Sequence, residues 1–404
     1  MNQLLTITVL FLLAMSRPAF DNKHIENDKE LLQKAIKLAH ETIIIDSHID
    51  APYRFGENKE DISQRTESGD FDYPRAKQGG LNAAFMSIFV PPKCQETGGA
   101  KELADSVIDL VEKVALDFPD KFAIAISTED IKKQFHAGKI SLPMGMENGA
   151  GIEDNLENLK HFYGRGIRYI TLSHSKSNLI TDSSFDKKRK WNGLSPFGEK
   201  VIAEMNRLGI IIDVSHVTDS AFYDVMKLTK APVIASHSSC RYFTPGWERN
   251  MSDKMIKALA KNGGVIQINF GSIFINTKYN RGYYEVKDKV NVYIKENDLD
   301  RDSEETRNYK KELLKEKVLK KANVSDVADH IDHVVDLAGI NHVGIGSDYD
   351  GSGPTLPIGL EDVSKYPNLI CELLRRGYSE KDIEKICSGN LLRVWSEVER
   401  IAMN

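Results

Sequence analysis

This sequence has no excess of basic charge, no long apolar run and few cysteines, and each of these features excludes a class of protein. The formal net charge is −5, so no strongly basic face is expected, and nucleic acid and anionic lipid are poor candidate partners. The apolar run at residues 4–15 has the length of a signal-peptide core and is too short to span a bilayer. We therefore expect no integral membrane span in the mature chain.

Cysteine occurs only four times, and no two cysteines form a CxxC pair. Export of the chain would permit disulfides, but this spacing identifies no partners. Buried or free thiols are the simpler interpretation. The four residues are Cys94, Cys240, Cys371 and Cys387.

Motifs for serine and nucleotide chemistry are also missing. The sequence contains no GxSxG motif, and in SHSS (236–239) the serine and histidine are adjacent, so on a strand they point to opposite faces. Phosphate-loop and dinucleotide fingerprints are absent, and the acidic end of GIGSDYDG would repel a phosphate. These absences disfavour a serine hydrolase and a nucleotide-binding protein.

The N-terminus has features of an exported protein. Ala14, Ser16 and Ala19 lie at the end of the apolar run and offer cleavage sites. We predict a signal peptide over residues 1–20 and a periplasmic or secreted chain that is soluble once this peptide is removed. Residues 21–404 are then expected to form a single domain. An uncleaved amphipathic or buried N-terminal segment is the alternative.

The rest of the chain alternates between apolar runs and amphipathic segments. Apolar residues make up 41% of the 404 residues and charged residues 28%, which allows a large core. Many runs are continuous, as in parallel strands buried on both faces, and segments such as 198–209 and 252–264 end at glycine, as helices do. We predict an α/β fold, a (β/α)₈ barrel of the TIM type.

The predicted strands number nine, one more than such a barrel needs. Residues 121–127 are the candidate for a strand that pairs irregularly. The nine runs are 42–50, 81–90, 121–127, 142–149, 167–175, 209–216, 232–239, 263–270 and 342–351.

Residues 276–323 interrupt the alternation with a segment rich in Lys, Glu, Asp, Asn and Tyr. We predict a solvated insertion that is helical in its second half. It lies between the last two strands, on the loop side of the barrel. It could cover the active site, and a plain exposed excursion is an equally good interpretation.

Histidine or a carboxylate follows six of the predicted strands. Because a barrel of this type builds its site from the C-terminal ends of its strands, we expect these side chains to converge. A single histidine at a strand end is usually structural, but the repetition over six strands favours a site. The residues are His48, Asp50, Glu147, His174, His216, His237 and Asp348.

His330 and His333 have a spacing that resembles a metal-binding pair. They lie within VSDVADHIDHVVDLAG, whose apolar pattern is that of an amphipathic helix. We expect both to be structural.

The residue types at the strand ends suit zinc. Imidazole nitrogen and carboxylate oxygen are both good Zn²⁺ ligands, and a catalytic zinc uses three protein ligands. Three histidines and two carboxylates exceed that number, so five ligands with one shared carboxylate fit two metals. Two zinc ions can bind a bridging hydroxide and polarise a carbonyl together. We therefore expect a hydrolase with two zinc ions per chain.

Several longer motifs resemble the membrane dipeptidases, also called renal dipeptidases, which are metal-dependent enzymes with an amidohydrolase-like barrel. The resemblance covers residues from about 30 to 400. It implies a zinc dipeptidase that hydrolyses the peptide bond of dipeptides and forms a homodimer. The motifs are IDSHIDAP, MGMENG, YITLSHSKSN, IDVSHV, PVIASHSSCR, ERNMSD, HVGIGSDYDG and LEDVSKYPNLICELLRRGYSE.

The resemblance also implies metal ligands. His48 and Asp50 match the ligands of the first metal, and His216 and His237 match those of the second. Glu147 matches the carboxylate that bridges both metals.

Three further residues match working groups of the family. Asp348 matches the residue that handles the proton, and His174 matches the histidine that contacts substrate and stabilises the tetrahedral intermediate. Arg249 matches the arginine that binds the C-terminal carboxylate of the substrate, for which a guanidinium fork is well suited.

The sequence departs from the family at three places. The stretch from His237 to Arg249 is one residue longer than in the animal enzymes, and Gly271 stands where other members can carry a tyrosine. The insertion at 276–323 is also atypical. These departures leave the substrate range open. Another amide or lactam hydrolase on the same metal centre, or a catalytically silent barrel that binds peptides, remains an alternative to the dipeptidase.

Overall fold

The computed structural model describes residues 20–403 of the chain, apart from residues 59, 302 and 318. Except for Phe20, the predicted signal peptide lies outside these residues. None of the described helices has the combination of length and apolar character that crossing a bilayer requires.

Eight parallel strands form a closed ring. Hydrogen-bonded pairing runs from β1 through β2 and β5 to β10. A parallel bridge between Ile49 and Tyr349 returns β10 to β1, and the Asp50 N–H donates to the Tyr349 carbonyl at 2.9 Å. This ring confirms the predicted (β/α)₈ barrel. Its strands are β1 (Ile44–Ile49), β2 (Leu81–Phe89), β5 (Met144–Glu147), β6 (Ile167–Thr171), β7 (Ile211–Asp213), β8 (Ile234–Ser238), β9 (Val265–Ile268) and β10 (Val343–Ile345).

Two short strands lie outside the ring. β4 (Ile140–Leu142) pairs with β2 through Ser141 and Ala83, and β3 (Phe122–Ile124) pairs with β4. The prediction that 121–127 is the irregular strand is therefore confirmed. β4 was not predicted as a separate strand; Pro143, which has no N–H to donate, separates it from β5.

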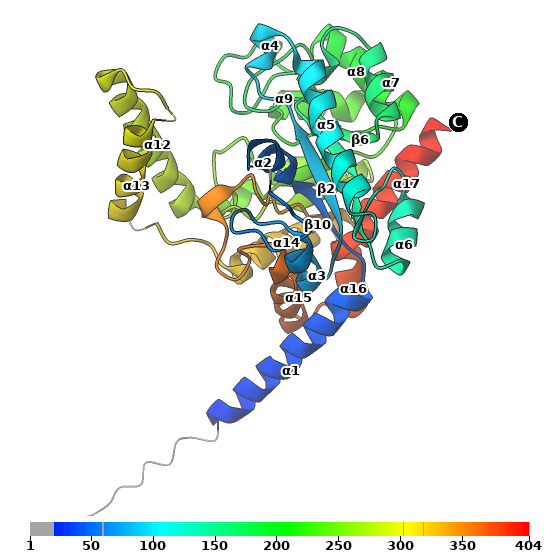
Figure 1. The fold of residues 1–404 in the computed structure, drawn as a ribbon, viewed down its shortest axis with the longest axis vertical. Coiled ribbons are helices and arrows are strands. Elements are labelled where there is room, and N and C mark those ends of the chain that lie inside the picture. The colour runs from blue at the N-terminus through cyan, green and yellow to red at the C-terminus, as the bar shows by residue number, and fades with distance from the viewer. Residues whose placement is uncertain (1–19, 59, 302, 318, 404) are drawn as a thin grey trace, which may run out of the picture.

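Helices follow the strands and surround the ring (Figure 1). The predicted helix at 198–209 is α8, where the Ser195 hydroxyl accepts from the Gly198 N–H and Gly209 ends the helix at φ 80°. The helix predicted at 252–264 is α10. The helices of the barrel and its margins are α1 (Phe20–Glu41), α2 (Ala51–Asn58), α3 (Tyr73–Gly79), α4 (Cys94–Thr97), α5 (Ala100–Asp117), α6 (Thr128–His136), α7 (Glu157–Gly164), α8 (Pro196–Leu208), α9 (Asp219–Leu228), α10 (Asp253–Lys261), α11 (Ser272–Ile275), α14 (Val324–Ala338), α15 (Tyr366–Arg375), α16 (Glu380–Glu384) and α17 (Asn390–Ala402).

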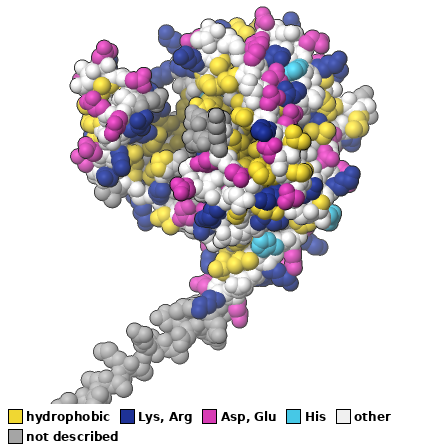
Figure 2. Space-filling view, in the orientation of Figure 1, with side chains coloured by type: hydrophobic (Ala, Val, Ile, Leu, Met, Phe, Trp, Pro, Cys, Tyr) yellow, Lys and Arg dark blue, Asp and Glu magenta, His cyan; other side chains and the backbone are white. Residues whose placement is uncertain are grey.

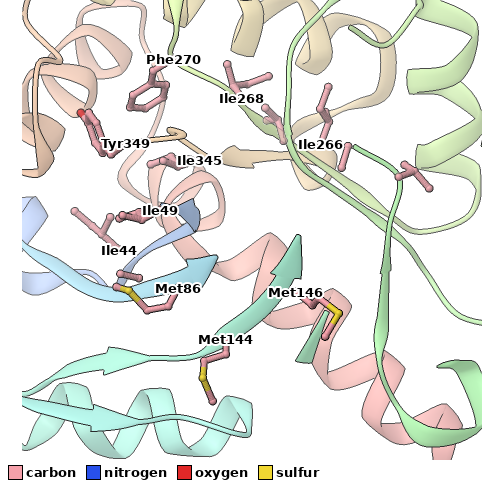
Figure 3. Packing of buried hydrophobic residues seen from close by; sticks show 14 of the residues in the cluster. Ile44, Ile49, Met86, Met144, Met146, Ile266, Ile268, Phe270, Ile345 and Tyr349 are labelled. Atoms are coloured by element: carbon pink, nitrogen blue, oxygen red, sulfur yellow. The ribbon is translucent and has the colours of Figure 1, made fainter. Parts of the chain in front are cut away.

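Successive residues of the strands pack into two separate cores, because side chains alternate between the faces of a strand. Ile44 belongs to the larger core, part of which Figure 3 shows, while Ile45 belongs to the smaller one. In the smaller core, Phe85 packs between Tyr169 and Trp395 of α17, with ring centroids 5.2 and 5.4 Å away. α17 therefore packs against one end of the barrel interior, and the opposite end carries the site.

Two long helices form an arm that stands away from the barrel (Figure 1). They are α12 (Thr277–Asn297) and α13 (Glu304–Lys317). The rings of Tyr293 and Tyr309 stack across the pair at 4.0 Å, and the Tyr293 hydroxyl donates to Glu305 at 2.7 Å. The prediction that the second half of the insertion is helical is confirmed. Its first half, for which no helix was predicted, is helical as well, because Val286 and Val290 give α12 a buried face.

Candidate metal centre

Glu147 lies at the centre of the strand ends, and its two carboxylate oxygens face different neighbours. Oε2 lies 3.7 Å from Nε2 of His48. Oε1 lies 3.2 Å from Nε2 of His216 and 3.4 Å from Nε2 of His237. One carboxylate between two groups of nitrogen donors can contact two cations at once.

The structure brings together every residue that was predicted at a strand end. Within this cluster, three groups of donor atoms lie close enough to share an ion, each with all its atoms within 4.8 Å of one another. The groups are His48, Glu147 and His237; Glu147, His174 and His216; and His48, Asp50 and Asp348.

Tyr169 determines which nitrogen of His48 is available. The Tyr169 hydroxyl donates to the Ser47 carbonyl at 3.0 Å, so its oxygen accepts from Nδ1–H of His48 at 2.8 Å. The lone pair of His48 is then on Nε2, which is buried without a hydrogen-bond partner and lies 3.6 Å from Oδ1 of Asp50. A lone pair that faces carboxylates is stabilised by a cation between them.

His237 has the same arrangement with a serine in place of the tyrosine. The Ser236 hydroxyl donates to Asp213 at 2.6 Å and therefore accepts from Nδ1–H of His237 at 2.8 Å. The Nε2 lone pair of His237 points towards Nε2 of His216, 2.8 Å away. This donor set of imidazole nitrogens and carboxylate oxygens fits divalent metal ions such as zinc.

The ionisation of the cluster also favours a bound cation. Burial lowers the pKa of His48, but Tyr169, Asp50 and Glu147 together raise it well above its ordinary value. Without a metal ion, a proton therefore takes the Nε2 position that faces the carboxylates, and a metal ion would replace that proton. Burial raises the pKa of Glu147, but the surrounding histidines hold it well below its usual range. Glu147 therefore stays charged although it is buried, and it draws positive charge to this point.

Asp348 follows β10 in a left-handed backbone conformation with φ 62°. Its Oδ2 accepts hydrogen bonds from Nδ2 of Asn269 and from the Ser352 hydroxyl, both at 2.9 Å. Burial and the neighbouring charge of Asp50 raise the pKa of Asp348 to about 8. A carboxyl group with a pKa near neutrality can accept and release a proton.

Gly351 permits the two aspartates to approach. A Cβ atom at this position would lie 2.0 Å from Oδ2 of Asp50 and 2.3 Å from Oδ1 of Asp348. Any other residue would displace both carboxylates.

Arg249 is a buried cation beside the metal centre. Its Nη1 donates to the Ser238 hydroxyl and its Nη2 to the His237 carbonyl, both at 2.8 Å, while its Nε has no hydrogen-bond partner. Among the described residues no carboxylate lies within ion-pair distance of it, and burial lowers its pKa to about 10. A guanidinium in this condition is suited to binding an anionic ligand.

His174 lies in the loop after β6 and is 24% exposed, more than the other histidines of the cluster. Its Nε2 lies 3.6 Å from Oε1 of Glu147, and the ring of Phe89 packs edge-on against it at 4.8 Å. Burial lowers the pKa of His174, which keeps the ring neutral. It can therefore contact a substrate that approaches the metal ligands.

Four supporting residues of the site were not predicted from the sequence: Tyr169, Asp213, Asn269 and Gly351. Tyr169 lies within β6, where it resembles a core residue, and Asp213 is the last residue of β7. Asn269 and Gly351 lie at strand ends, and that position was the signal that could have identified them. The four cysteines are free and none is among the site residues.

Comparison with known proteins gives consistent matches. The family model described as "Membrane dipeptidase (Peptidase family M19)" matches residues 32–404. Dipeptidase tcpJ of Claviceps purpurea is 34% identical over 346 residues, which cover 83% of this chain and 71% of that protein. Dipeptidase aclJ of Aspergillus oryzae is 35% identical over 343 residues, with the same coverage of 83% and 71%. The solved structure of the probable dipeptidase PvdM from Pseudomonas aeruginosa has a TM-score of 0.80 and 30% identity, and the match covers 92% of this chain and 99% of that one.

Proposed function

The chain belongs to the membrane dipeptidase family and is a metallo-dipeptidase; from that premise we propose that it hydrolyses dipeptides with two zinc ions. The observation that supports this most is the position of Glu147, whose two oxygens face separate groups of donors. His48 and Asp50 would bind one zinc on the Oε2 side. His216 and His237 would bind the other on the Oε1 side.

When bound, the zinc pair supplies Lewis acidity, which acidifies water and polarises the peptide carbonyl. Tyr169 and Ser236 orient the ligand histidines through their Nδ1 protons, so that their Nε2 lone pairs point inwards. Such outer partners fix the tautomer and the ring orientation before the substrate arrives.

Asp348 is the residue that we assign to proton transfer. It would accept a proton from the attacking water and pass it to the amine that leaves. Asn269 and Ser352 fix its Oδ2, and its raised pKa suits both halves of this task.

His174 and Arg249 are assigned to the substrate. His174 would stabilise the negative charge that develops on the carbonyl oxygen. Arg249 would bind the C-terminal carboxylate of the dipeptide. This would favour dipeptides over longer chains, because in a longer peptide the residue after the scissile bond has a peptide bond in place of a free carboxylate.

The proposal is tested by assaying the zinc-loaded chain on dipeptides, N-acyl amino acids and β-lactams, with the zinc content measured alongside. We expect dipeptides to be the best substrates and two zinc ions to be bound per chain. Cleavage of N-acyl amino acids or β-lactams without cleavage of dipeptides would contradict the proposed function.

We also infer that the chain is exported, from the apolar run at residues 4–15 and the small residues after it. Fractionation of the source cells and the mass of the mature N-terminus test this. A cytoplasmic chain that retains residues 1–20 would contradict it.

A further inference from the structure

Aromatic rings from four separate segments lie together beside the metal centre. They are Phe185 from the loop after β6, Trp247 from the loop after β8, Phe274 from α11 and Tyr284 from α12. Trp247 is central, with its ring centroid 5.2 Å from Phe274, 5.9 Å from Tyr284 and 6.1 Å from Phe185. We call these four residues the aromatic cluster.

The aromatic cluster contacts a proposed metal ligand, His216, and the proposed carboxylate-binding residue, Arg249. The ring of Phe185 lies 5.7 Å from that of His216, and the guanidinium carbon of Arg249 lies 5.0 Å from the ring centre of Phe274. Phe274 is buried, whereas the other three rings are partly exposed. Phe274 therefore packs against the guanidinium of Arg249, while the other three rings have exposed surface that a ligand can contact.

Tyr284 is the member that comes from the arm. Burial and the neighbouring Tyr283 raise the pKa of Tyr284 to about 12, against the opposing charge of Arg249, so the phenol remains neutral. Tyr283 itself lies next to α13, where Nζ of Lys310 is 5.8 Å from its ring centre. The two adjacent tyrosines thus have different surroundings, one beside the site and one within the arm.

The end of β9 does not offer a side chain to this corner of the site. A Cβ atom at Gly271 would lie 2.6 Å from the Ser352 hydroxyl and 3.1 Å from the ring of Phe274. The serine would have to shift, and it is a hydrogen-bond donor to Asp348. The side chain at this corner of the site therefore comes from the arm, as Tyr284, and not from the end of β9.

The surface view agrees with this arrangement. Figure 2 shows the molecule hollowed between the arm and the barrel, with hydrophobic side chains along the hollow. In the same view the arm forms one side of this hollow (Figure 2).

We propose that the aromatic cluster is the subsite for the side chain of the C-terminal residue of the dipeptide, and that Tyr284 makes it selective for large apolar or aromatic side chains. This inference rests on the proposed function, because Arg249 places the C-terminal carboxylate beside the cluster. The side chain branches from the carbon that bears this carboxylate and so lies next to the rings. The N-terminal residue lies across the scissile bond, away from the cluster.

The test compares kcat/KM of the zinc-loaded enzyme for Ala-Phe, Phe-Ala and Ala-Gly, with the C-terminal residue in both L and D forms where it is chiral. In Tyr284→Ala we expect kcat/KM for Ala-Phe to fall about tenfold, mainly through KM, because an aromatic contact is lost. The values for Phe-Ala and Ala-Gly should stay within about twofold. Tyr284→Phe, which keeps the ring and the packing of α12, should retain the wild-type preference.

Tyr309→Ala, which removes a ring that stacks on Tyr293 within the arm, is the matched control and should leave all three values unchanged. An equal loss on all three substrates in Tyr284→Ala, or no loss on Ala-Phe, would overturn the subsite while the dipeptidase activity stood. A loss in Tyr284→Phe as large as in Tyr284→Ala would overturn selectivity by the ring. If the wild-type enzyme cleaves none of the three, the proposed function itself fails.

Discussion

His216 and His237 differ from His330 and His333 in what their ring nitrogens contact. On α14, Nδ1 and Nε2 of His330 are both hydrogen-bonded to backbone groups, at 3.0 and 3.1 Å, and His333 is bonded to Asp253 at 2.9 Å. At the strand ends, Nε2 of His216 and Nε2 of His237 instead lie 2.8 Å from each other. The residue type is the same, and the partners differ.

This difference separates a structural histidine from a ligand. His330 has both ring nitrogens paired within the protein and so has no capacity left for a metal ion, which confirms the prediction that it is structural. His333 bonds to Asp253 through Nε2 and belongs to none of the donor groups that could share an ion among the described residues. The ring of His237, whose Nδ1–H is bound by Ser236 and whose Nε2 faces Glu147, is arranged for one, and Nε2 of His216 faces the same carboxylate. The four predictions below test this contrast.

Replacing one member of each pair by alanine should give opposite results. His237→Ala removes a proposed ligand, and we expect kcat/KM to fall by about 10³-fold together with the zinc content. His330→Ala leaves the Cys240 N–H and the Ile275 carbonyl unpaired. It should cost about 2 kcal/mol of unfolding free energy without changing kcat/KM of the folded enzyme. Equal losses of activity in both variants would contradict the distinction between a ligand histidine and a structural one.

Asp348→Asn separates binding from chemistry within the strand-end set. The amide cannot accept the proton, so turnover should fall by about 10³-fold while both zinc ions remain bound. Asp336→Asn on the exposed face of α14 is the control and should be fully active. Full activity of the Asp348→Asn enzyme would contradict the assignment of proton transfer to Asp348.

Arg249→Lys tests the cation that lies beside the strand-end histidines. Loss of the planar guanidinium should raise KM for dipeptides about 30-fold with little change in kcat. The reason is that the substrate carboxylate is bound equally in the enzyme–substrate complex and in the transition state. Arg165→Lys, in an ion-pair cluster with Asp105 and Asp109, is the matched control. An unchanged KM in Arg249→Lys would remove the arginine from the substrate site.

The smallest effect concerns the pH dependence of stability. Burial lowers the pKa of His330 to about 3 in the folded chain, below its ordinary value of 6.5. The unfolded chain therefore binds the proton first, and the stability that the neutral ring contributes is lost as pH falls from about 6.5 towards 3. Between pH 7 and pH 5 the loss should be about 2 kcal/mol.

Urea unfolding of the metal-free chain at both pH values measures this loss. The difference between wild type and His330→Gln should shrink by that amount at pH 5, because the variant lacks the titrating group. A difference that does not depend on pH would show that His330 is not held neutral.

Much of the barrel and of the site was predictable because both leave periodic signals. Continuous apolar runs identified the strands, and the polar residues after them identified the cluster around Glu147. The supporting group Tyr169 gave no such signal, since it lies inside β6 and acts through His48, which is distant in sequence. Asp213 is the last residue of β7 and carried the same signal as the predicted residues, but it acts through Ser236 and not directly at the metal centre. β4 and the first half of the arm were missed because one is only three residues long and the other has a polar composition.

The account depends most on the two oxygens of Glu147 facing two zinc ions, and stepwise addition of zinc to the metal-free chain tests this directly. Activity on a dipeptide, measured after each addition, should stay low through the first equivalent and rise with the second. Glu147→Gln should gain no activity at either step. Full activity at one zinc per chain, or an active Glu147→Gln enzyme, would contradict the shared carboxylate.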